Sequence, residues 1–444
     1  MGQNLVEDRL GERAYIRGGE RAILVGLELE GAREDLSELA QLSATAGVQV
    51  LGRVIQRRRR PDPSYFIGEG KVERLREQAE LVSADTIIFN DSLSPAQSRN
   101  LEERLERKVI DRPQLIMSIF AQHARTKEAK LQVELAQLEY LLPRIRGWGA
   151  VLTGLGGGIG TRGPGETKME QERRRIKRRI QRIREELEKT AKERRVKGKR
   201  RQRSGLPIVV LLGYTNSGKS TLLNRLSGTQ AHVEDKLFAT LDPLVRQAAL
   251  PDGRRFLLID TVGFIRKLPP QLVPAFLSTL EAVREADLLL NVLDISNREV
   301  FMHLKTVHQV LADLFDNNPW PPLLNVLNKV DLLEGPEGEE RLARAINEMR
   351  NPVPISALEG EGLDRLLMRI EEELGPPQER LRVRIPYAQA ALLDELHRRG
   401  VVERAEYDAE GILVEVALAG EPLRRLERRA AEAGLKLERL PFQP

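Results

Sequence analysis

A short turn at residues 213 to 220 carries residue types that bind phosphate. Its sequence, GYTNSGKS, follows the apolar run PIVVLL and precedes TLLNR, which favours a helix. Glycines let backbone amides converge on an anion, Lys219 brings a positive charge to the β- and γ-phosphates, and Ser220 offers a hydroxyl to Mg²⁺. Since strand, turn and helix come in the required order, the turn predicts a nucleoside triphosphate site.

Two further segments are expected to face the γ-phosphate. The apolar run RRFLLID ends in DTVG, residues 260 to 263, where a carboxylate can hold Mg²⁺ through water and a glycine amide can contact the γ-phosphate. The intervening segment KLFATLDP contains a threonine that is expected to join the metal shell when the γ-phosphate is present. The predicted catalytic residues are Lys219, Thr240 and Gly263, and the predicted metal ligands are Ser220, Thr240 and Asp260.

The choice of base is expected to lie with NKVD, residues 328 to 331. The Asp331 carboxylate can accept hydrogen bonds from N1–H and the 2-amino group of guanine, and adenine offers neither donor there. The backbone of SAL, residues 356 to 358, is expected near guanine O6, so GTP is predicted in preference to ATP. The predicted nucleotide-binding residues are Gly213, Tyr214, Thr215, Asn216, Ser217, Gly218, Lys219, Ser220, Thr221, Phe238, Ala239, Thr240, Leu241, Asp242, Asp260, Thr261, Val262, Gly263, Asn328, Lys329, Asp331, Ser356, Ala357 and Leu358.

The residue after DTVG is Phe264, where many signalling GTPases carry a glutamine that orients the attacking water. Phenylalanine cannot do this. The sequence therefore predicts slow intrinsic hydrolysis of GTP to GDP and phosphate, with the water positioned by backbone, by a neighbouring residue or by a macromolecular activator.

The elements that would position these residues form an α/β multidomain chain. Residues 1–112 show a βαβαβα pattern, which predicts a small parallel sheet. Residues 113–204 show two seven-residue apolar repeats around a glycine-rich segment, which predict a long antiparallel helical hairpin with its tip at 146–166 and a linker at KGKRRQRSG. Residues 205–373 predict a doubly wound, mostly parallel sheet, and residues 374–444 a ferredoxin-like α+β domain.

The second arm of that hairpin concentrates positive charge. Residues 171–203 hold 17 Lys or Arg against five Glu, although the whole chain has a formal net charge of only +5. Few glutamates stand four residues away to pair with RRRIKRRIQRIR, so a polyanion such as RNA is the favoured partner over a self-solvating helix. The predicted RNA contacts are Trp148, Arg162, Arg173, Arg174, Lys177 and Arg178.

Composition narrows the class of protein further. The 444 residues include no cysteine, which excludes disulfide scaffolds and thiol chemistry, and the five histidines lack metal-ligand spacing. No apolar run is long enough to cross a membrane, and the first 20 residues lack an apolar signal core. We therefore expect a cytoplasmic protein without a membrane span that is monomeric when free.

With these motifs placed, the chain resembles the HflX family of ribosome-associated GTPases over nearly its whole length. The resemblance rests on GLGGGIGTRGPGE ahead of a basic helix, GYTNSGKSTLLN, LFATLD and DTVGF. It implies binding to the large ribosomal subunit and its ribosomal RNA, insertion of the hairpin tip towards the peptidyl-transferase region, and a role in splitting or rescuing stalled ribosomes under stress. The family is also associated with ATP use by its N-terminal part, for which this sequence shows no strong motif.

Two other functions fit the same motifs. One is a ribosome-assembly GTPase, which would also bind ribosomal RNA but prefer immature particles. The other is a GTP-dependent regulatory switch that uses the hairpin as a coiled-coil arm for a protein partner.

Overall fold

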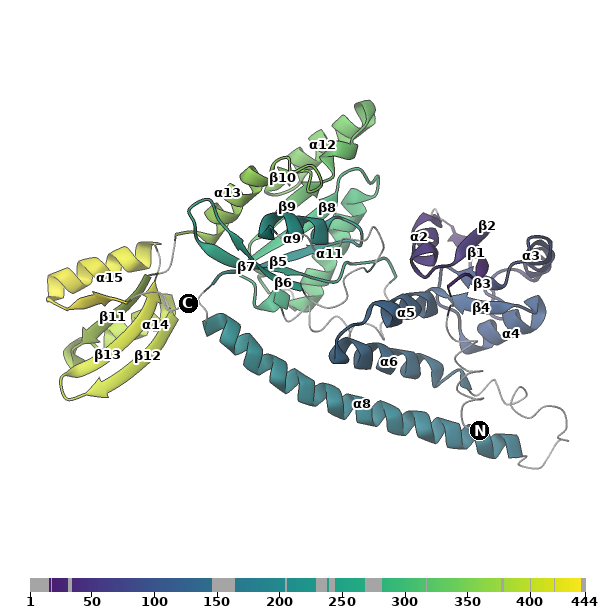
Figure 1. Cartoon of the computed structure of the whole chain (residues 1–444), viewed down its shortest axis with the longest axis horizontal. Coiled ribbons are helices and arrows are strands. Elements are labelled where there is room, and N and C mark those ends of the chain that lie inside the picture. Colours follow the sequence, from purple (N-terminus) through teal and green to yellow (C-terminus); the bar gives the residue numbers. More distant parts are fainter. Residues whose placement is uncertain are drawn as a thin grey trace.

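The computed structural model describes residues 16, 18–30, 34–145, 164–203, 206–228, 238, 244–267, 282–316, 318–376, 379–399, 401–418 and 420–440. Three α/β units follow one another along the chain, and a 40-residue helix, α8 (Pro164–Arg203), runs past the first two of them (Figure 1). We refer to the units as the N-terminal, central and C-terminal domains.

The N-terminal domain is a four-stranded parallel sheet in the order β2-β1-β3-β4. Every residue of β3 is buried, as expected for a parallel sheet with helices on both faces. Two of its helices carry a proline in their first turn, Pro95 and Pro113. The N-cap residues of these helices, Ser94 and Asp111, form capping boxes. Its elements are β1 (Arg21–Leu29), α2 (Ser37–Thr45), β2 (Gln49–Arg58), α3 (Glu69–Leu81), β3 (Thr86–Phe89), α4 (Pro95–Leu105), β4 (Lys108–Asp111) and α5 (Arg112–His123).

The first arm of the predicted hairpin is two helices, α5 and α6 (Lys127–Leu141), separated at Thr126. The Thr126 side chain accepts a hydrogen bond from the Ala129 amide and so begins α6, while α5 is buried in the N-terminal domain. Only α6 pairs with α8, in the opposite direction, through an apolar cluster centred on Leu131, Leu135 and Ile180 (Figure 1). The predicted linker at KGKRRQRSG is also corrected, because α8 continues through Arg203.

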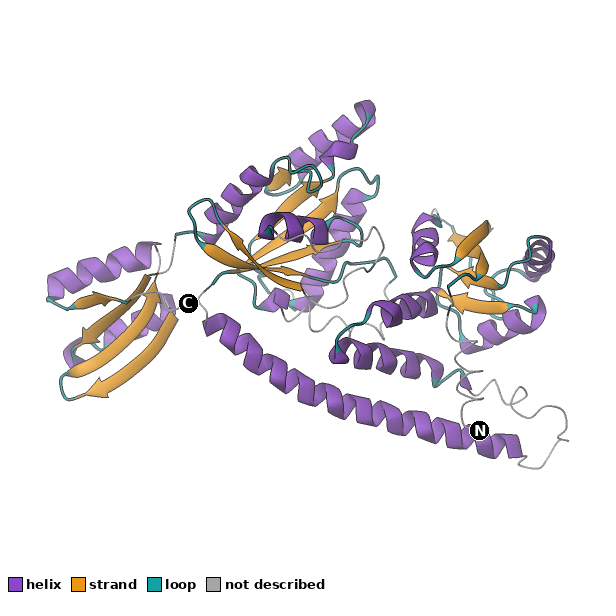
Figure 2. Cartoon of the chain, viewed as in Figure 1, coloured by secondary structure: helices purple, strands orange, loops and turns teal. Residues whose placement is uncertain are grey.

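The central domain is a six-stranded sheet in the order β10-β9-β8-β5-β7-β6, in which only β6 is antiparallel. Helices lie on both faces (Figure 2), and the carboxyl ends of β5, β7, β8 and β9 lead to the predicted site. Its elements are β5 (Ile208–Gly213), α9 (Lys219–Ser227), β6 (Leu244–Ala249), β7 (Arg255–Asp260), β8 (Leu288–Asp294), α11 (Val300–Leu314), β9 (Leu323–Asn328), η3 (Val330–Leu332), α12 (Gly335–Glu348), β10 (Pro352–Pro354) and α13 (Leu363–Leu374).

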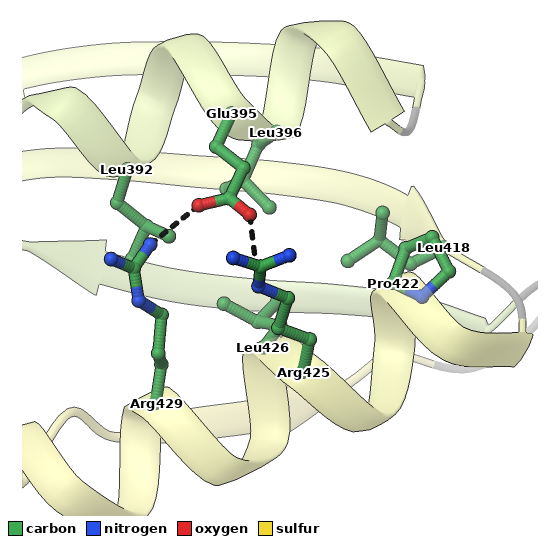
Figure 3. A pocket seen from close by; sticks show the side chains of 8 residues that line it. All are labelled: Leu392, Glu395, Leu396, Leu418, Pro422, Arg425, Leu426 and Arg429. Atoms are coloured by element: carbon green, nitrogen blue, oxygen red, sulfur yellow. Dashed lines mark hydrogen bonds and ion pairs between the residues drawn. The ribbon is translucent and has the colours of Figure 1, made fainter.

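The C-terminal domain has a βαββαβ order and the antiparallel strand order β12-β13-β11-β14, a ferredoxin-like arrangement. Both of its helices share one apolar cluster with the sheet. A shallow pocket lies between them, where Arg425 and Arg429 both contact the Glu395 carboxylate (Figure 3). Its elements are β11 (Glu379–Ile385), η4 (Tyr387–Gln389), α14 (Ala391–Arg399), β12 (Val401–Asp408), β13 (Gly411–Leu418), α15 (Gly420–Ala433) and β14 (Leu437–Arg439).

The sheet topologies confirm the predicted parallel α/β, doubly wound and ferredoxin-like domains, and α6 with α8 forms the helical hairpin before the doubly wound domain, with a shorter first arm than predicted. Among the helices of the described part of the chain, none is long and apolar enough to span a membrane.

Candidate nucleotide site

The predicted phosphate-binding turn joins β5, which is wholly buried, to α9. Gly218 precedes the helix with a φ of +95°, and a Cβ there would also lie 2.1 Å from Nδ2 of Asn328. Asn216, with a φ of +58°, is exposed at the crest of the turn. The chain therefore turns sharply into the N-terminus of α9, where free amides and the helix dipole favour an anion.

Lys219 is the first residue of α9 and its side chain folds back over the turn. The ammonium donates to the carbonyl oxygens of Gly213 at 3.2 Å and Tyr214 at 2.7 Å. Burial lowers the pKa of Lys219 to about 8, against the opposing effect of the Asp260 carboxylate. The loop thus holds a desolvated amine whose charge an arriving phosphate would stabilise.

Ser220 and Asp260 bring a hydroxyl and a carboxylate together beside the turn. Ser220 Oγ donates to Asp260 Oδ2 at 2.6 Å, and the aspartate is fully buried at the end of β7. Hydroxyl and carboxylate oxygens suit Mg²⁺, which takes its remaining ligands from phosphates and water. The described residues contain no group of three or more His, Cys, Asp or Glu that could hold a metal by themselves. This pair therefore fits a metal that arrives with the nucleotide.

The DTVGF segment is hydrogen-bonded to the phosphate-binding turn. The Thr215 amide donates to the Phe264 carbonyl at 2.8 Å, and the Phe264 amide donates to the Gly213 carbonyl at 3.0 Å. The Phe264 ring packs against an apolar cluster that contains Ile259 and Val283. Thr261 Oγ1 donates to the Leu211 carbonyl at 2.6 Å, so this hydroxyl joins the strands.

On the base side, one amide side chain connects three loops. Asn328 is 2% exposed at the end of β9. Its Nδ2 donates to the Ser217 carbonyl at 2.8 Å, and its Oδ1 accepts from the Ala357 amide at 2.9 Å. The side chain fixes the phosphate-binding turn relative to residues 356–358, and buried hydrogen bonds of this kind are costly to break.

The neighbouring base-side residues are held by charged partners. Lys329 forms an ion pair with Asp294 at 2.8 Å, and Asp331 is exposed in η3. Arg225, near the end of α9, donates to the carbonyl oxygens of Ala357 at 3.2 Å and of Leu358. The base side is thus assembled entirely from the central domain.

The N-terminal domain contacts the opposite, phosphate side of the site. Arg112, 2% exposed at the start of α5, donates through Nη2 to the Arg266 carbonyl at 2.9 Å and to Glu38 at 2.8 Å. Its Nη1 donates to Asn90 Oδ1 at 2.8 Å. Lys267 forms an ion pair with Asp91. Arg266 and Lys267, just beyond DTVGF, are therefore both bound by side chains of the N-terminal domain.

A histidine packs on the phosphate-binding turn from the side of α11. The rings of Tyr214 and His303 stack with centroids 3.8 Å apart and planes 10° apart. Burial lowers the pKa of His303, and burial together with the nearby Glu38 carboxylate raises the pKa of Tyr214. Both rings are therefore neutral, and the Tyr214 side chain packs on His303 while the Tyr214 carbonyl accepts from Lys219.

The structure brings most of the predicted nucleotide residues together around the ends of β5, β7 and β9. Phe238 is buried, although not at the phosphates: its ring packs edge-on against Phe120 with centroids 4.6 Å apart. The predicted residues Ala239, Thr240, Leu241 and Asp242 lie outside the described residues, as do Trp148 and Arg162.

On α8, ion pairs to α6 neutralise part of the basic face. Arg179 pairs with Glu134 at 2.6 Å and Arg184 with Glu139 at 2.7 Å. Glutamates of α6, rather than glutamates of α8 itself, thus pair with these two arginines. Of the predicted RNA contacts, Arg174 pairs with Glu170, and Lys177 and Arg178 are exposed.

Several residues at the site carry no sequence motif. Glu38, Arg112 and Phe120 belong to another domain, and Arg225 is one cation among many. One signal was available for Arg112: an arginine separated by only two residues from the mostly apolar run LIMSIF must find partners inside the fold. Its partners lie up to 154 residues away, and no local pattern reveals them.

Models of four protein regions match the chain in order. They are GTP-binding GTPase N-terminal at 33–121, GTP-binding GTPase middle region at 123–201, 50S ribosome-binding GTPase at 208–329, and HflX C-terminal domain at 341–437.

Relatives agree with these models over nearly the full length. The GTPase HflX of Caldanaerobacter subterraneus is 47% identical over 92% of this chain and 94% of its own. That of Escherichia coli is 41% identical over 88% and 92%. A Sulfolobus solfataricus GTP-binding protein, solved with GDP, is 27% identical over 80% of this chain and 98% of its own, with a TM-score of 0.42. The chain belongs to the HflX family of GTPases, and it is a guanine-nucleotide-binding GTP hydrolase.

Proposed function

We propose that GTP binds with Mg²⁺ between the turn at 213–220 and residues 328–331. Lys219 and the α9 amides bind the phosphates, Asp331 selects guanine, and Ser220, Asp260 and Thr240 hold the metal, which would neutralise charge on the phosphates. Water attacks the γ-phosphorus, the bond to the β–γ bridging oxygen breaks, and the electron pair stays on GDP.

We further propose that the protein binds the large ribosomal subunit and uses this cycle to split, rescue or remodel stalled ribosomes. The observation that carries the proposal is a GTPase domain of the ribosome-binding type joined to a hairpin with an exposed basic face. Lys177, Arg178 and Arg182 are exposed on α8. Cations outside ion pairs favour a phosphate backbone.

The Phe264 geometry supports an external activator. Its backbone is bonded to the phosphate-binding turn and its ring packs in an apolar cluster, so it supplies no group to orient water. Contact with a large partner would then order the loops that position the attacking water.

The test is GTP turnover with and without purified large ribosomal subunits, at fixed salt. We expect the subunits to stimulate turnover, and the triple variant Lys177→Glu, Arg178→Glu, Arg182→Glu to lose most of that stimulation. The matched control is Arg424→Glu with Arg428→Glu, which reverses charge on two exposed arginines of α15. Equal turnover with and without subunits would refute the ribosomal role while leaving GTP hydrolysis intact.

A protein partner is the second candidate, because α8 already uses part of its charge to bind α6. Binding to RNA phosphates weakens steeply with salt. Stimulation that survives both high salt and nuclease would favour the protein partner. Comparing mature with immature large subunits separates ribosome rescue from assembly.

A further inference from the structure

The γ-phosphate side of the site is closed by its own backbone. A Cβ on Gly263 would lie 2.7 Å from Cα of Thr215 and 2.8 Å from Nζ of Lys219. There is no space for even one added carbon between DTVG and the phosphate-binding turn. The Thr215 backbone cannot move aside as the Lys219 side chain can, so we expect residues 260–264 to retreat when a γ-phosphoryl group enters to bind both Lys219 and the Gly263 amide.

The residues on either side of Gly263 are packed into the N-terminal domain. Val262 is 2% exposed and Ile265 is 4% exposed, and both belong to the apolar cluster formed by α2, α5 and α6. Phe238, from the segment that precedes Thr240, lies in the same cluster against Phe120. Val262, Ile265 and Phe238 are therefore buried in a domain that contributes no predicted phosphate ligand.

A buried polar junction fixes the chain just beyond this loop. Arg112 donates to the Arg266 carbonyl and to Glu38, while the Arg266 amide lies 3.5 Å from Glu38 Oε1. One pair of side chains thus binds both polar groups of the Arg266 backbone. Since Arg112 is almost fully buried, its bonds to an ionised partner are strong and directional.

We propose that Glu38 and Arg112 are positioning residues of the γ-phosphate loop and that docking of the N-terminal domain disfavours GTP relative to GDP. The inference rests on the proposed nucleotide site. GDP lacks the group that would displace Gly263, so the docked arrangement accepts it. GTP must push the loop against contacts made by another domain, and by linkage GTP must weaken those contacts equally.

The experiment is to measure the affinities of full-length protein for GDP and for a non-hydrolysable GTP analogue by calorimetry. In the Glu38→Gln variant, which keeps the shape of the side chain, we expect the analogue to gain roughly five- to tenfold over GDP, the lower end of typical allosteric couplings. GDP affinity and the melting temperature of the central domain should stay close to wild type.

A second variant covers a failure of Glu38→Gln to fold. Asp91→Asn removes the nearer of two carboxylates that contact Lys267, at a part-exposed position, and leaves Glu34 at 4.0 Å; it should shift the ratio in the same direction. The control is Glu73→Gln, which removes an ion pair with Arg104 on the same domain away from the junction. An unchanged or lowered ratio in both test variants would overturn the inference. Failure of the wild type to bind GDP would instead overturn the nucleotide site.

Discussion

The two halves of the nucleotide site are stabilised in different ways. On the base side, Asn328 bonds to Ser217 and Ala357, Lys329 to Asp294, and Arg225 to the loop at 356–358, all within the central domain. On the γ-phosphate side, DTVGF is bonded to the phosphate-binding turn and is held from outside by α2 and α5.

This difference suggests that the two halves have different functions, one in binding the base and the other in responding to the γ-phosphate. We expect the half that is complete within one domain to bind guanine in the same way in every nucleotide state. For the half that is held by contacts with a second domain, we expect a second arrangement when those contacts are released, as in other conformational switches. On the proposed site, contacts to the base would therefore hold the nucleotide, while the third phosphate would change the relation between domains.

The largest effect is expected from Lys219, whose ammonium lies in the phosphate-binding turn. Lys219→Ala removes the buried cation at the phosphates, so the affinities for GDP and for the GTP analogue should both fall by at least roughly a hundredfold, the scale of losing a charge-assisted contact in a desolvated site. Calorimetry measures this. Lys305→Ala, at an exposed position of α11, is the control, and a Lys219→Ala protein that still holds GDP tightly would contradict the assignment.

The next largest effect concerns the base alone. Asp331→Asn replaces the acceptor of the two guanine donors, and we expect the preference for GTP over xanthosine triphosphate to fall by about a hundredfold, because unpaired polar groups in a recognition site discriminate strongly. Competition binding with both nucleotides gives the ratio. Glu359→Gln, an exposed carboxylate beside the same loops, should leave it unchanged. Retained guanine preference in Asp331→Asn would show that another group reads the base.

The same division explains what sequence reasoning found and what it missed. The turn at 213–220 was predictable because a strand, a glycine turn and a helix are encoded within about 20 neighbouring residues. Glu38 and Arg266 are 228 residues apart, and their contact depends on how two folded domains dock. No spacing rule reports such a contact.

The hairpin shows how a correct periodicity can hide a boundary. The seven-residue repeat continued through Ala124 to Leu138, so one helix was predicted. Ala124 instead packs into the N-terminal domain, and Thr126 starts a new helix as an N-cap. A threonine followed by KEAK was the local sign of this start.

A pH dependence should appear on the phosphate side. Burial lowers the pKa of Lys219 to about 8 in the free protein, and bound phosphates raise it again because they favour the charged form. Binding of GDP above pH 8 therefore takes up a proton, and affinity should fall by up to about tenfold per pH unit above 8. Calorimetry in two buffers of different ionisation enthalpy counts the protons.

At pH 8.5 we expect uptake of about half a proton or more, and at pH 7 close to none, because there Lys219 is almost fully protonated and the GDP phosphates are almost fully ionised. Equal uptake at both pH values would mean that the amine is charged before the nucleotide arrives. The dependence should be the same for GDP and for the GTP analogue if Lys219 retains its contacts in both.

The smallest effect tests the comparison itself. Arg225→Met removes two bonds to carbonyl groups of residues 357 and 358 but keeps the unbranched side chain, and the guanidinium is exposed to solvent. We expect a loss of only about threefold in affinity, as for a solvent-exposed contact of under 1 kcal/mol. Because Arg225 contacts only the loop on the base side, the affinities for GDP and for the GTP analogue should fall equally. Glu38→Gln should do the opposite, since it shifts their ratio with little change for GDP. If Arg225→Met also shifted the ratio, the base side would be coupled to the γ-phosphate loop, and the two halves would act as one unit.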